Sequence, residues 1–274
     1  MIRLAALLAL ATSCGGFIDD QAAKSTYRII STSIKASQRE ADVELARDAL
    51  PGGLMQLEAF AIAYPKHGGF RALHTDALCG FAIGFVFDDW EDATLTGRET
   101  DAAKLTERLQ GLVERCIAAN TARLPTNWRT TFTGPQAPAA LWIASAEIVR
   151  LAQAPFAHAA ELPAIRALLE RSAAVAPGLR DGEAELLLAT LAALTGGDST
   201  AAFARARAAA GPGALIVDTM LARTCGDRAL FRTTLERVIA TDPAAWPDRR
   251  LANELARRKA RRYLTAIDTL VPGS

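Results

Sequence analysis

The side chains that could carry out catalysis are scattered along the sequence. The three histidines are His67, His74 and His158, and a metal site that used the first two would need carboxylates brought in by the fold. The sequence has no Gly-x-Ser-x-Gly elbow, phosphate-binding loop or dinucleotide fingerprint. Because no nucleophile is paired with a base, we predict that the protein is not an enzyme and uses no metal and no cofactor.

The densest charge in the sequence is an acidic run, Asp88-Asp89-Trp90-Glu91-Asp92. It follows an apolar segment, and we expect it to lead into a polar loop that ends near residue 100. The run could bind a cation or a basic patch on a partner protein, or it could be a solvated loop without a ligand. A large aromatic residue amid charge often anchors a protein contact. We therefore place Asp88, Asp89 and Trp90 among the candidate contacts, although Trp90 could instead fold back onto the apolar segment.

The last predicted helix, from about 247 to 271, is strongly basic. A basic helix can lie on anionic lipid or face an acidic partner. We favour a simpler interpretation, in which it is the polar outer face that a stack of helical repeats needs for solubility. Within it, Asn253 lies among apolar residues, and we expect it to bond a neighbouring backbone group. The cationic residues are Arg249, Arg250, Arg257, Arg258, Lys259, Arg261 and Arg262.

Composition and charge narrow the class of protein. Hydrophobic residues make up 50% of the 274 residues, which is enough for a sizeable core, while aromatic residues are only 6%. Lys and Arg number 31 against 30 Asp and Glu, so the charge gives no reason to expect binding to nucleic acid. Alternating runs of Val, Ile and Thr are scarce, which leaves little from which strands could form. We therefore predict an all-α protein.

The first residues form a targeting segment that does not belong to the fold. Arg3 precedes a short apolar stretch over 4–12, and small residues then lead to Cys14. This pattern resembles the lipobox of bacterial lipoproteins, so we predict a signal peptide over 1–13 and lipidation of Cys14. The alternative is an ordinary signal peptide with an incidental cysteine. Gly15 stands where an Asp retains some lipoproteins at the inner membrane, which favours the outer one. We expect no later run to span a membrane.

Export directed by this segment places three further cysteines in an oxidising compartment. They are Cys79, Cys116 and Cys225. Their spacing fits no zinc site, and an odd number cannot all pair within the chain. Cys79 and Cys116 fall in helices that could be neighbours, so a disulfide is one interpretation. Buried free thiols are the other, because Cys packs well as a small apolar residue.

The helices that must position these residues repeat in the C-terminal half. A short signature has a large apolar residue at Leu169, Phe203 and Leu235, with anchors 34 and 32 residues apart. Each anchor is followed two residues later by an Arg, and eight residues later by a Pro or Gly at 177, 211 and 243. This period is typical of tetratricopeptide-type helical hairpins. We predict one helical repeat domain over 14–274, with hairpins stacked as an α-solenoid.

The predicted domain has an N-terminal helical half, about 19–123, and a repeat half, about 139–271. A Pro-rich connection over 124–138 joins them. We expect the turn Pro51-Gly52-Gly53 to break one helix into two. The aromatic residues Phe81, Phe85, Phe87 and Trp142 could line an inner cavity between helices or pack in the core. The helices are predicted over 19–37, 42–50, 54–64, 70–87, 101–123, 139–152 and 247–271.

The order of these segments resembles the T-component family of TRAP transporters, which are tetratricopeptide-like periplasmic lipoproteins. The resemblance is carried by DVELARDALPGGLMQLEAFAIAYP (42–65), CGFAIGFVFDD (79–89), LWIASAEIVRL (141–151), ELPAIRALLERSAAVAP (161–177) and DRRLANELARRKARRYLTAID (248–268). It covers nearly the whole mature chain. It implies a scaffold that docks a periplasmic solute-binding protein, is trimeric in some members, and has a pore-like passage with a suggested role for hydrophobic ligands.

We therefore expect a lipid-anchored scaffold in the bacterial cell envelope, facing the periplasm and serving a TRAP-type uptake system through protein contacts. A general envelope scaffold without a transporter is the second hypothesis. The third is a binder of small apolar molecules. The candidate contacts are Phe81, Phe85, Phe87, Asp88, Asp89, Trp90 and Trp142.

Overall fold

The computed structural model describes residues 2–272, with side chains described from Asp20 onward. Every regular element in this part of the chain is helical, as the sequence predicts, and it contains no strand. The predicted signal peptide and Cys14 lie in the first part of α1, outside the described side chains. The helices are α1 Ile2–Ser37, α2 Val43–Ala63, α3 Gly68–Phe81, α4 Phe87–Leu95, α5 Glu99–Thr121, α6 Trp128–Thr131, α7 Ala137–Gln153, α8 Pro155–His158, α9 Leu162–Val175, α10 Glu183–Leu194, α11 Ser199–Ala210, α12 Leu215–Thr224, α13 Arg228–Ala240, α14 Arg250–Thr265 and α15 Ile267–Leu270.

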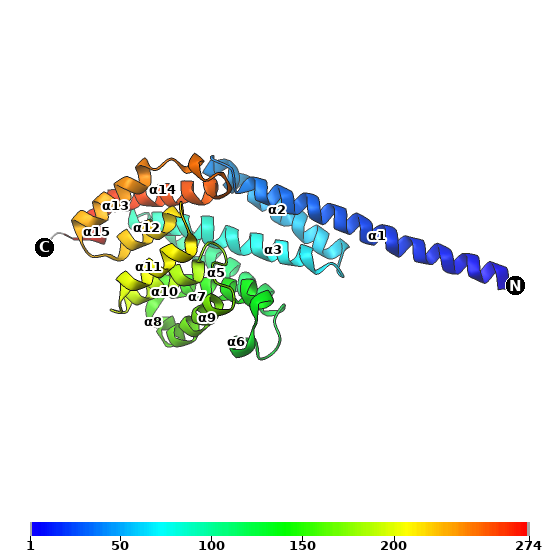
Figure 1. Ribbon diagram of the computed structural model, residues 1–274. Helices are drawn as coiled ribbons and strands as arrows, with labels where there is room; N and C mark the ends of the chain where they lie inside the picture. The colour runs from blue at the N-terminus through cyan, green and yellow to red at the C-terminus, as the bar shows by residue number, and fades with distance from the viewer. Residues whose placement is uncertain (1, 273–274) are drawn as a thin grey trace.

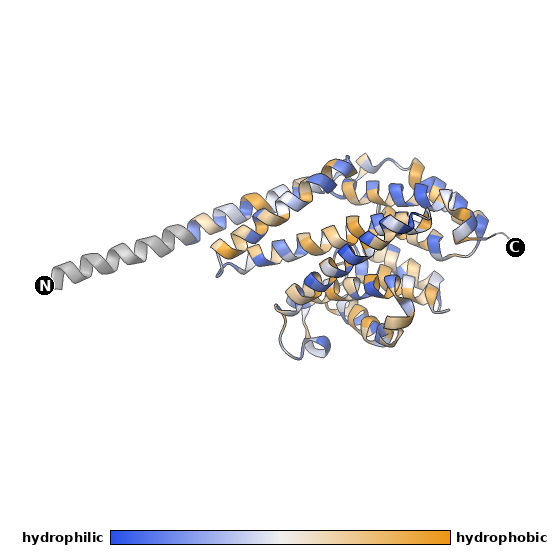
Figure 2. Cartoon of the chain, turned by 180° about the vertical axis from the view of Figure 1, so that it is seen from behind, coloured by the Kyte–Doolittle hydropathy of each residue, from blue (hydrophilic) through white to orange (hydrophobic). Residues whose placement is uncertain are grey.

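The first three helices form an arm that projects from the rest of the molecule (Figure 1). Within the arm, α1 packs against α3 through the ring of Tyr27, which contacts the ring of Phe70. The two ring centroids are 5.7 Å apart. A Cβ at Gly69 would lie 2.5 Å from the Tyr27 ring, so only glycine allows this approach. The arm also exposes apolar side chains such as Met55 and Ile62, and the C-terminal end of α2 is largely orange in Figure 2.

The predicted break at Pro51 is wrong, because α2 runs through it without interruption. Pro51 removes one helical hydrogen bond. However, its ring is exposed, and a Cβ added at either of the two glycines that follow would meet nothing within 4 Å. The buried residues Ala46 and Leu57, on either side of Pro51, lie on a helix that packs against α3. Tertiary packing therefore outweighs the local helix-breaking signal.

The helix that we expected to end near Phe87 continues to Leu95. A π-helical segment, Ala82–Val86, joins α3 to α4, so the acidic run is helical rather than part of a loop. The continuous helix, Gly68–Leu95, is long and apolar enough to cross a membrane by length and composition, which corrects the expectation that no later run would be. Phe81 and Phe85 are buried in the protein core, and their burial indicates a central core helix.

The repeat signature marks the first helix of each of three hairpins. Its apolar anchors lie on α9, α11 and α13, and each is buried. The Pro or Gly that follows each anchor falls just after the end of its helix, where the chain turns into α10, α12 or α14. Each of these second helices packs against the first. The predicted helical hairpins are therefore present in the C-terminal half.

Candidate functional site

The acidic run and the basic last helix, predicted separately, contact each other. Asp88 and Glu91 share one face of α4, and Lys259, Arg262 and Tyr263 share one face of α14. The Arg262 guanidinium donates to both carboxylate oxygens of Asp88, at 2.7 and 3.1 Å. Lys259 Nζ lies 3.1 Å from Asp88 Oδ1, and the Tyr263 hydroxyl donates to Glu91 at 2.7 Å. We call these five residues the α4–α14 clamp.

Burial and charge oppose each other at the clamp. Burial alone would raise the pKa of Asp88, but the charges of Lys259 and Arg262 outweigh it and lower that pKa to about 2. Burial raises the pKa of Tyr263 to about 12. Both groups therefore keep one protonation state near neutral pH, which suits a fixed connection between helices. The interpretation of the last helix as only a polar outer surface is therefore wrong, because Arg262 on its inward face is buried.

Beside the clamp, a charged groove of about 460 Å³ opens between α2, α4, α5 and α14. Asp89 lies within it and pairs with Arg47 of α2. Burial raises the pKa of Asp89, although Arg47 and Arg258 act in the opposite direction. The groove is lined by Arg47, Asp89, Asp92, Arg98, Asp101, Lys104, Leu105, Arg108 and Arg258.

Two cations on the α5 wall of this groove are free to meet a partner. Within the described residues, neither Lys104 nor Arg108 has a carboxylate within ion-pair distance. They lie one helical turn apart and are both exposed, with the Arg108 guanidinium 5.5 Å from the centre of the Phe81 ring. The lining holds five cationic side chains and three carboxylates, so it is positive on balance. Sequence reasoning missed both residues.

Neither of the two described pockets is lined by a candidate aromatic residue. Phe81 and Phe85 are 5% and 4% exposed and pack in the core. Trp90 folds back onto Phe87, with ring centroids 5.5 Å apart, and its indole N–H donates to the Thr106 hydroxyl at 2.9 Å. Trp90 is therefore held by its own helix and by α5.

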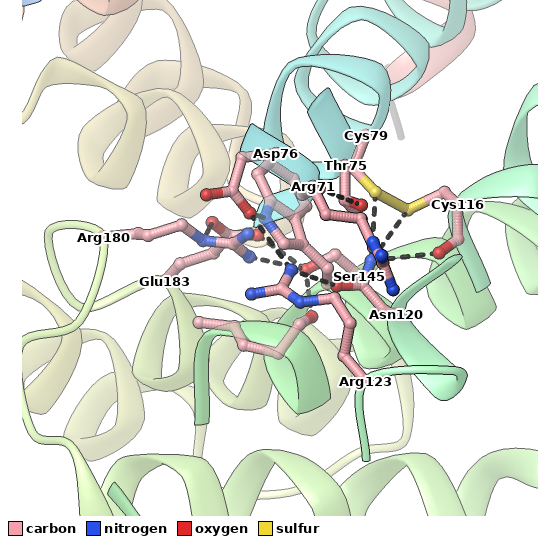
Figure 3. The surroundings of a disulfide bond; sticks show 12 residues. Arg71, Thr75, Asp76, Cys79, Cys116, Asn120, Arg123, Ser145, Arg180 and Glu183 are labelled. Carbon is pink, nitrogen blue, oxygen red and sulfur yellow. Dashed lines mark hydrogen bonds and ion pairs between the residues drawn. A yellow bond between two sulfur atoms is a disulfide. The ribbon is translucent and has the colours of Figure 1, made fainter. Parts of the chain in front are cut away.

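Trp142 belongs to a separate polar cluster, of which Figure 3 labels Asp76, Arg180 and Glu183. Its indole N–H donates to Asp76 at 2.9 Å, and the Arg180 guanidinium lies 3.5 Å from the ring centre. Arg180 also pairs with Glu183 at 2.8 Å. It is one of two consecutive non-glycine residues with positive φ, 49° at Arg180 and 58° at Asp181, a strained turn that directs its side chain inward. Nothing in the sequence analysis singled out Arg180.

The structure decides between the two interpretations of the cysteines. Cys79 of α3 and Cys116 of α5 form a disulfide, and both are fully buried. The Asn120 amide donates to the Cys116 carbonyl oxygen at 2.9 Å (Figure 3). Cys225 is a free, partly exposed thiol. The disulfide fixes α3, which continues into the helix of the acidic run, to the helix that forms one wall of the groove.

The structure also places Asn253 and two of the histidines. Asn253 accepts a hydrogen bond from the Leu215 backbone N–H at 3.3 Å, as predicted. His67 contacts Phe70, with ring centroids 4.9 Å apart, and His158 contacts Glu161 at 3.0 Å. Within the described part of the chain, no three His, Cys, Asp or Glu side chains come together as a metal site would require.

Comparison with known proteins identifies the family. No curated protein matches the sequence significantly. A family model described as TRAP transporter T-component matches residues 39–270, a range that includes the clamp, the groove and all three repeat helices. The chain therefore belongs to the TRAP transporter T-component family.

Proposed function

We propose that the protein is a lipid-anchored scaffold that docks the solute-binding protein of a TRAP transporter at the charged groove. Membership of the T-component family carries the proposal, because it makes the protein part of a transporter with other subunits to contact. The groove supports it as the contact surface. Four helices build its walls, and the clamp and the disulfide hold those walls in place.

The free cations indicate how the groove would recognise that partner. Lys104 and Arg108 project from a surface whose other charges are already paired, so they can take carboxylates without breaking an internal bond. Charged side chains at the rim of an interface speed association and select the partner. Trp90, which is partly buried on the neighbouring helix α4, supplies aromatic area of the kind that often dominates binding energy.

The second part of the proposal is a lipid anchor at the N-terminus. Lipidation of Cys14 would tether α1 to a membrane, with the outer membrane favoured by Gly15, and would raise the local concentration of the docked protein. The buried disulfide supports a location outside the cytoplasm, because disulfides persist in oxidising compartments. Replacing Cys14 by Ser is expected to release the protein from the membrane fraction.

Binding of an apolar ligand has weaker support than docking. The expected lining residues Phe81 and Phe85 are core side chains, and a ligand between them would have to separate packed helices. We therefore assign the protein contact as the principal function, and the general envelope scaffold remains the alternative.

A site-specific crosslink tests the proposal against that alternative. A photoreactive amino acid replaces Lys104 in the groove, and a matched control replaces Glu170, an exposed residue on α9 that is absent from the groove lining. In the native envelope, we expect position 104, but not position 170, to capture the solute-binding protein of a TRAP transporter. Capture of other envelope proteins alone would support the general scaffold.

A further inference from the structure

Helix α2 is apolar on two of its faces. The inner face packs against α3 and includes the buried residue Leu57. The outer face carries exposed residues that lie three or four positions apart and therefore share one side of the helix, namely Pro51, Met55, Ala59 and Ile62. Met55 is 72% exposed and Ile62 is 74% exposed. A surface helix normally has a polar outer face, and a row of exposed apolar side chains indicates contact with something outside the molecule.

The outer face of α2 ends at a cluster of aromatic rings. This cluster lies at the end of the arm that points toward the N-terminus in Figure 1. Its centre is the ring of Phe70, and the centroids of three rings lie 5.7, 5.4 and 5.5 Å from it, those of Tyr27, Phe60 and Tyr64. Tyrosine is enriched where proteins meet the boundary between water and lipid. Ile62 lies between Phe60 and Tyr64 in the sequence, so exposed apolar area and tyrosines occur together at this end of the arm.

The same end of the arm is positively charged. Residues 20–35 and 55–74 together contain five Lys and Arg but only two carboxylates. Arg28, Lys66 and Arg71 are exposed, and none of them has a carboxylate within ion-pair distance in the part of the chain that the structure describes. Cations close to a membrane surface are attracted to anionic lipid. These three side chains are therefore available to the phosphates of a lipid surface.

The predicted lipid anchor lies on the same arm. Cys14 and Tyr27 are both in α1, and a rise of 1.5 Å per residue places them roughly 20 Å apart along the helix axis. Tyr27 contacts His67, in the turn between α2 and α3, with ring centroids 4.9 Å apart. An acylated Cys14 thus keeps the bilayer within reach of the end of the arm. A second copy of the chain is a poorer occupant of the outer face, because the cations of two arms would repel each other.

We propose that the arm binds the surface of an anionic membrane, with the outer face of α2 in the lipid headgroup region and Arg28, Lys66 and Arg71 on lipid phosphates. Amphipathic helices bind membranes in this way, parallel to the surface. The inference rests on the proposed lipid anchor for the position of the membrane, and it adds a second contact that fixes how the molecule stands there. Because α2 joins the charged groove through Arg47, near its other end, the groove stays open to a protein partner.

The depth of the arm in a bilayer tests the proposal. A fluorescent amino acid whose emission depends on polarity replaces Ala59 on the outer face, and a matched control replaces Ala167, an exposed alanine on α9. The protein, purified from the bacterial envelope, is reconstituted with vesicles of phosphatidylcholine and phosphatidylglycerol that contain a quencher on a lipid acyl chain. We expect the emission at position 59, but not at position 167, to shift to shorter wavelength and to be quenched.

Two other results would overturn the proposal. The first is the absence of quenching at position 59, whether the vesicles fail to hold the protein or the arm stays in water. The second is a shift to shorter wavelength without quenching that grows with the density of protein, because it would show that a second copy covers the outer face.

Substitutions identify which side chains make the contact. Ile62→Gln should lower the ratio of inserted to free arm about tenfold, because an apolar side chain no longer leaves water. Leu194→Gln, at an exposed leucine on α10, should leave the ratio unaltered. Lys66→Gln should lower it about fivefold with phosphatidylglycerol but not with phosphatidylcholine alone, and Lys104→Gln on α5 is the matched control. Both substituted arm residues are exposed, so these variants keep the packing of the fold. An unchanged ratio in Ile62→Gln and in Lys66→Gln would also overturn the proposal.

The anchor and the arm contact can fail separately. The mass of the purified protein shows whether Cys14 is acylated. Quenching at position 59 in an unacylated protein would reject the anchor and support the arm contact. An acylated protein without that quenching would reject the arm contact and support the anchor.

Discussion

Asp88 and Arg262 form a bidentate ion pair although they are 174 residues apart in the sequence, with donor–acceptor distances of 2.7 and 3.1 Å. Both residues are buried, at 4% and 8% exposed. The pair connects the central helix of the N-terminal half to the last long helix, so it joins parts of the chain that the repeat pattern alone would leave apart. Its cost of burial is offset by further contacts from Lys259 and Glu91.

Asp88→Ala should destabilise the protein strongly. It leaves the buried charges of Arg262 and Lys259 facing Glu91 alone, and removing one partner of a buried pair costs about 3–5 kcal/mol. Urea unfolding at neutral pH measures the change in the free energy of unfolding. Asp268→Ala is the control, because it breaks the exposed pair with Arg228 and should cost less than about 1 kcal/mol. Similar small losses in both variants would show that the clamp does not hold the fold together.

Acid should weaken the protein through the same carboxylate. The pKa of Asp88 is about 2 when folded and near 3.8 otherwise, so the folded state favours the ionised form. This difference stabilises the protein by about 2 kcal/mol above roughly pH 5, and the contribution is lost as pH falls through 4 toward 2. The free energy of unfolding, measured between pH 7 and pH 3, should fall less steeply in Asp88→Asn than in the wild type. Parallel curves would contradict the assignment.

The helical hairpins could be predicted because their signal is local and periodic. Leu169, Phe203 and Leu235 recur at a fixed interval, and burial of one face of each helix requires that recurrence. The break at Pro51 could not be judged in this way. A single lost hydrogen bond there competes with packing against α3, and the sequence does not show how much packing opposes it.

The clamp and groove depend on distances that sequence patterns do not encode. The acidic run resembled a solvated loop because its partners lie at the other end of the chain. Lys104 and Arg108 resembled the ordinary polar face of an amphipathic helix, and only the folded structure shows that their neighbours are paired and they are not. The sequence could not decide for or against the disulfide for the same reason, since pairing of Cys79 and Cys116 requires α3 and α5 to be neighbours.

Removal of the disulfide should lower stability without altering the groove charges. The bond closes a loop with a sequence separation of 37 residues, for which chain entropy predicts a contribution of about 3–4 kcal/mol. The double variant Cys79→Ala, Cys116→Ala should therefore unfold at lower urea concentration, and the wild type should shift in the same direction when a reductant is present. Cys225→Ala should leave that response to reductant intact. A wild-type midpoint that does not move under reducing conditions would mean that the bond contributes nothing to stability.

Charge reversal at Lys104 and Arg108 should weaken docking more than it weakens folding. Neither residue has a carboxylate partner among the described residues, so Lys104→Glu with Arg108→Glu breaks no internal ion pair. The double variant should bind the purified solute-binding protein at least about tenfold more weakly, mainly through slower association, because steering by charge acts on the on-rate. Raising the salt concentration should slow association of the wild type but not of the variant, because the variant has no excess of positive charge in the groove for salt to screen. Arg166→Glu on α9 repeats one charge change away from the groove and should leave the rates unaltered. If the double variant binds with normal rates while a groove crosslink persists, contact with the partner there depends on shape rather than on the free cations.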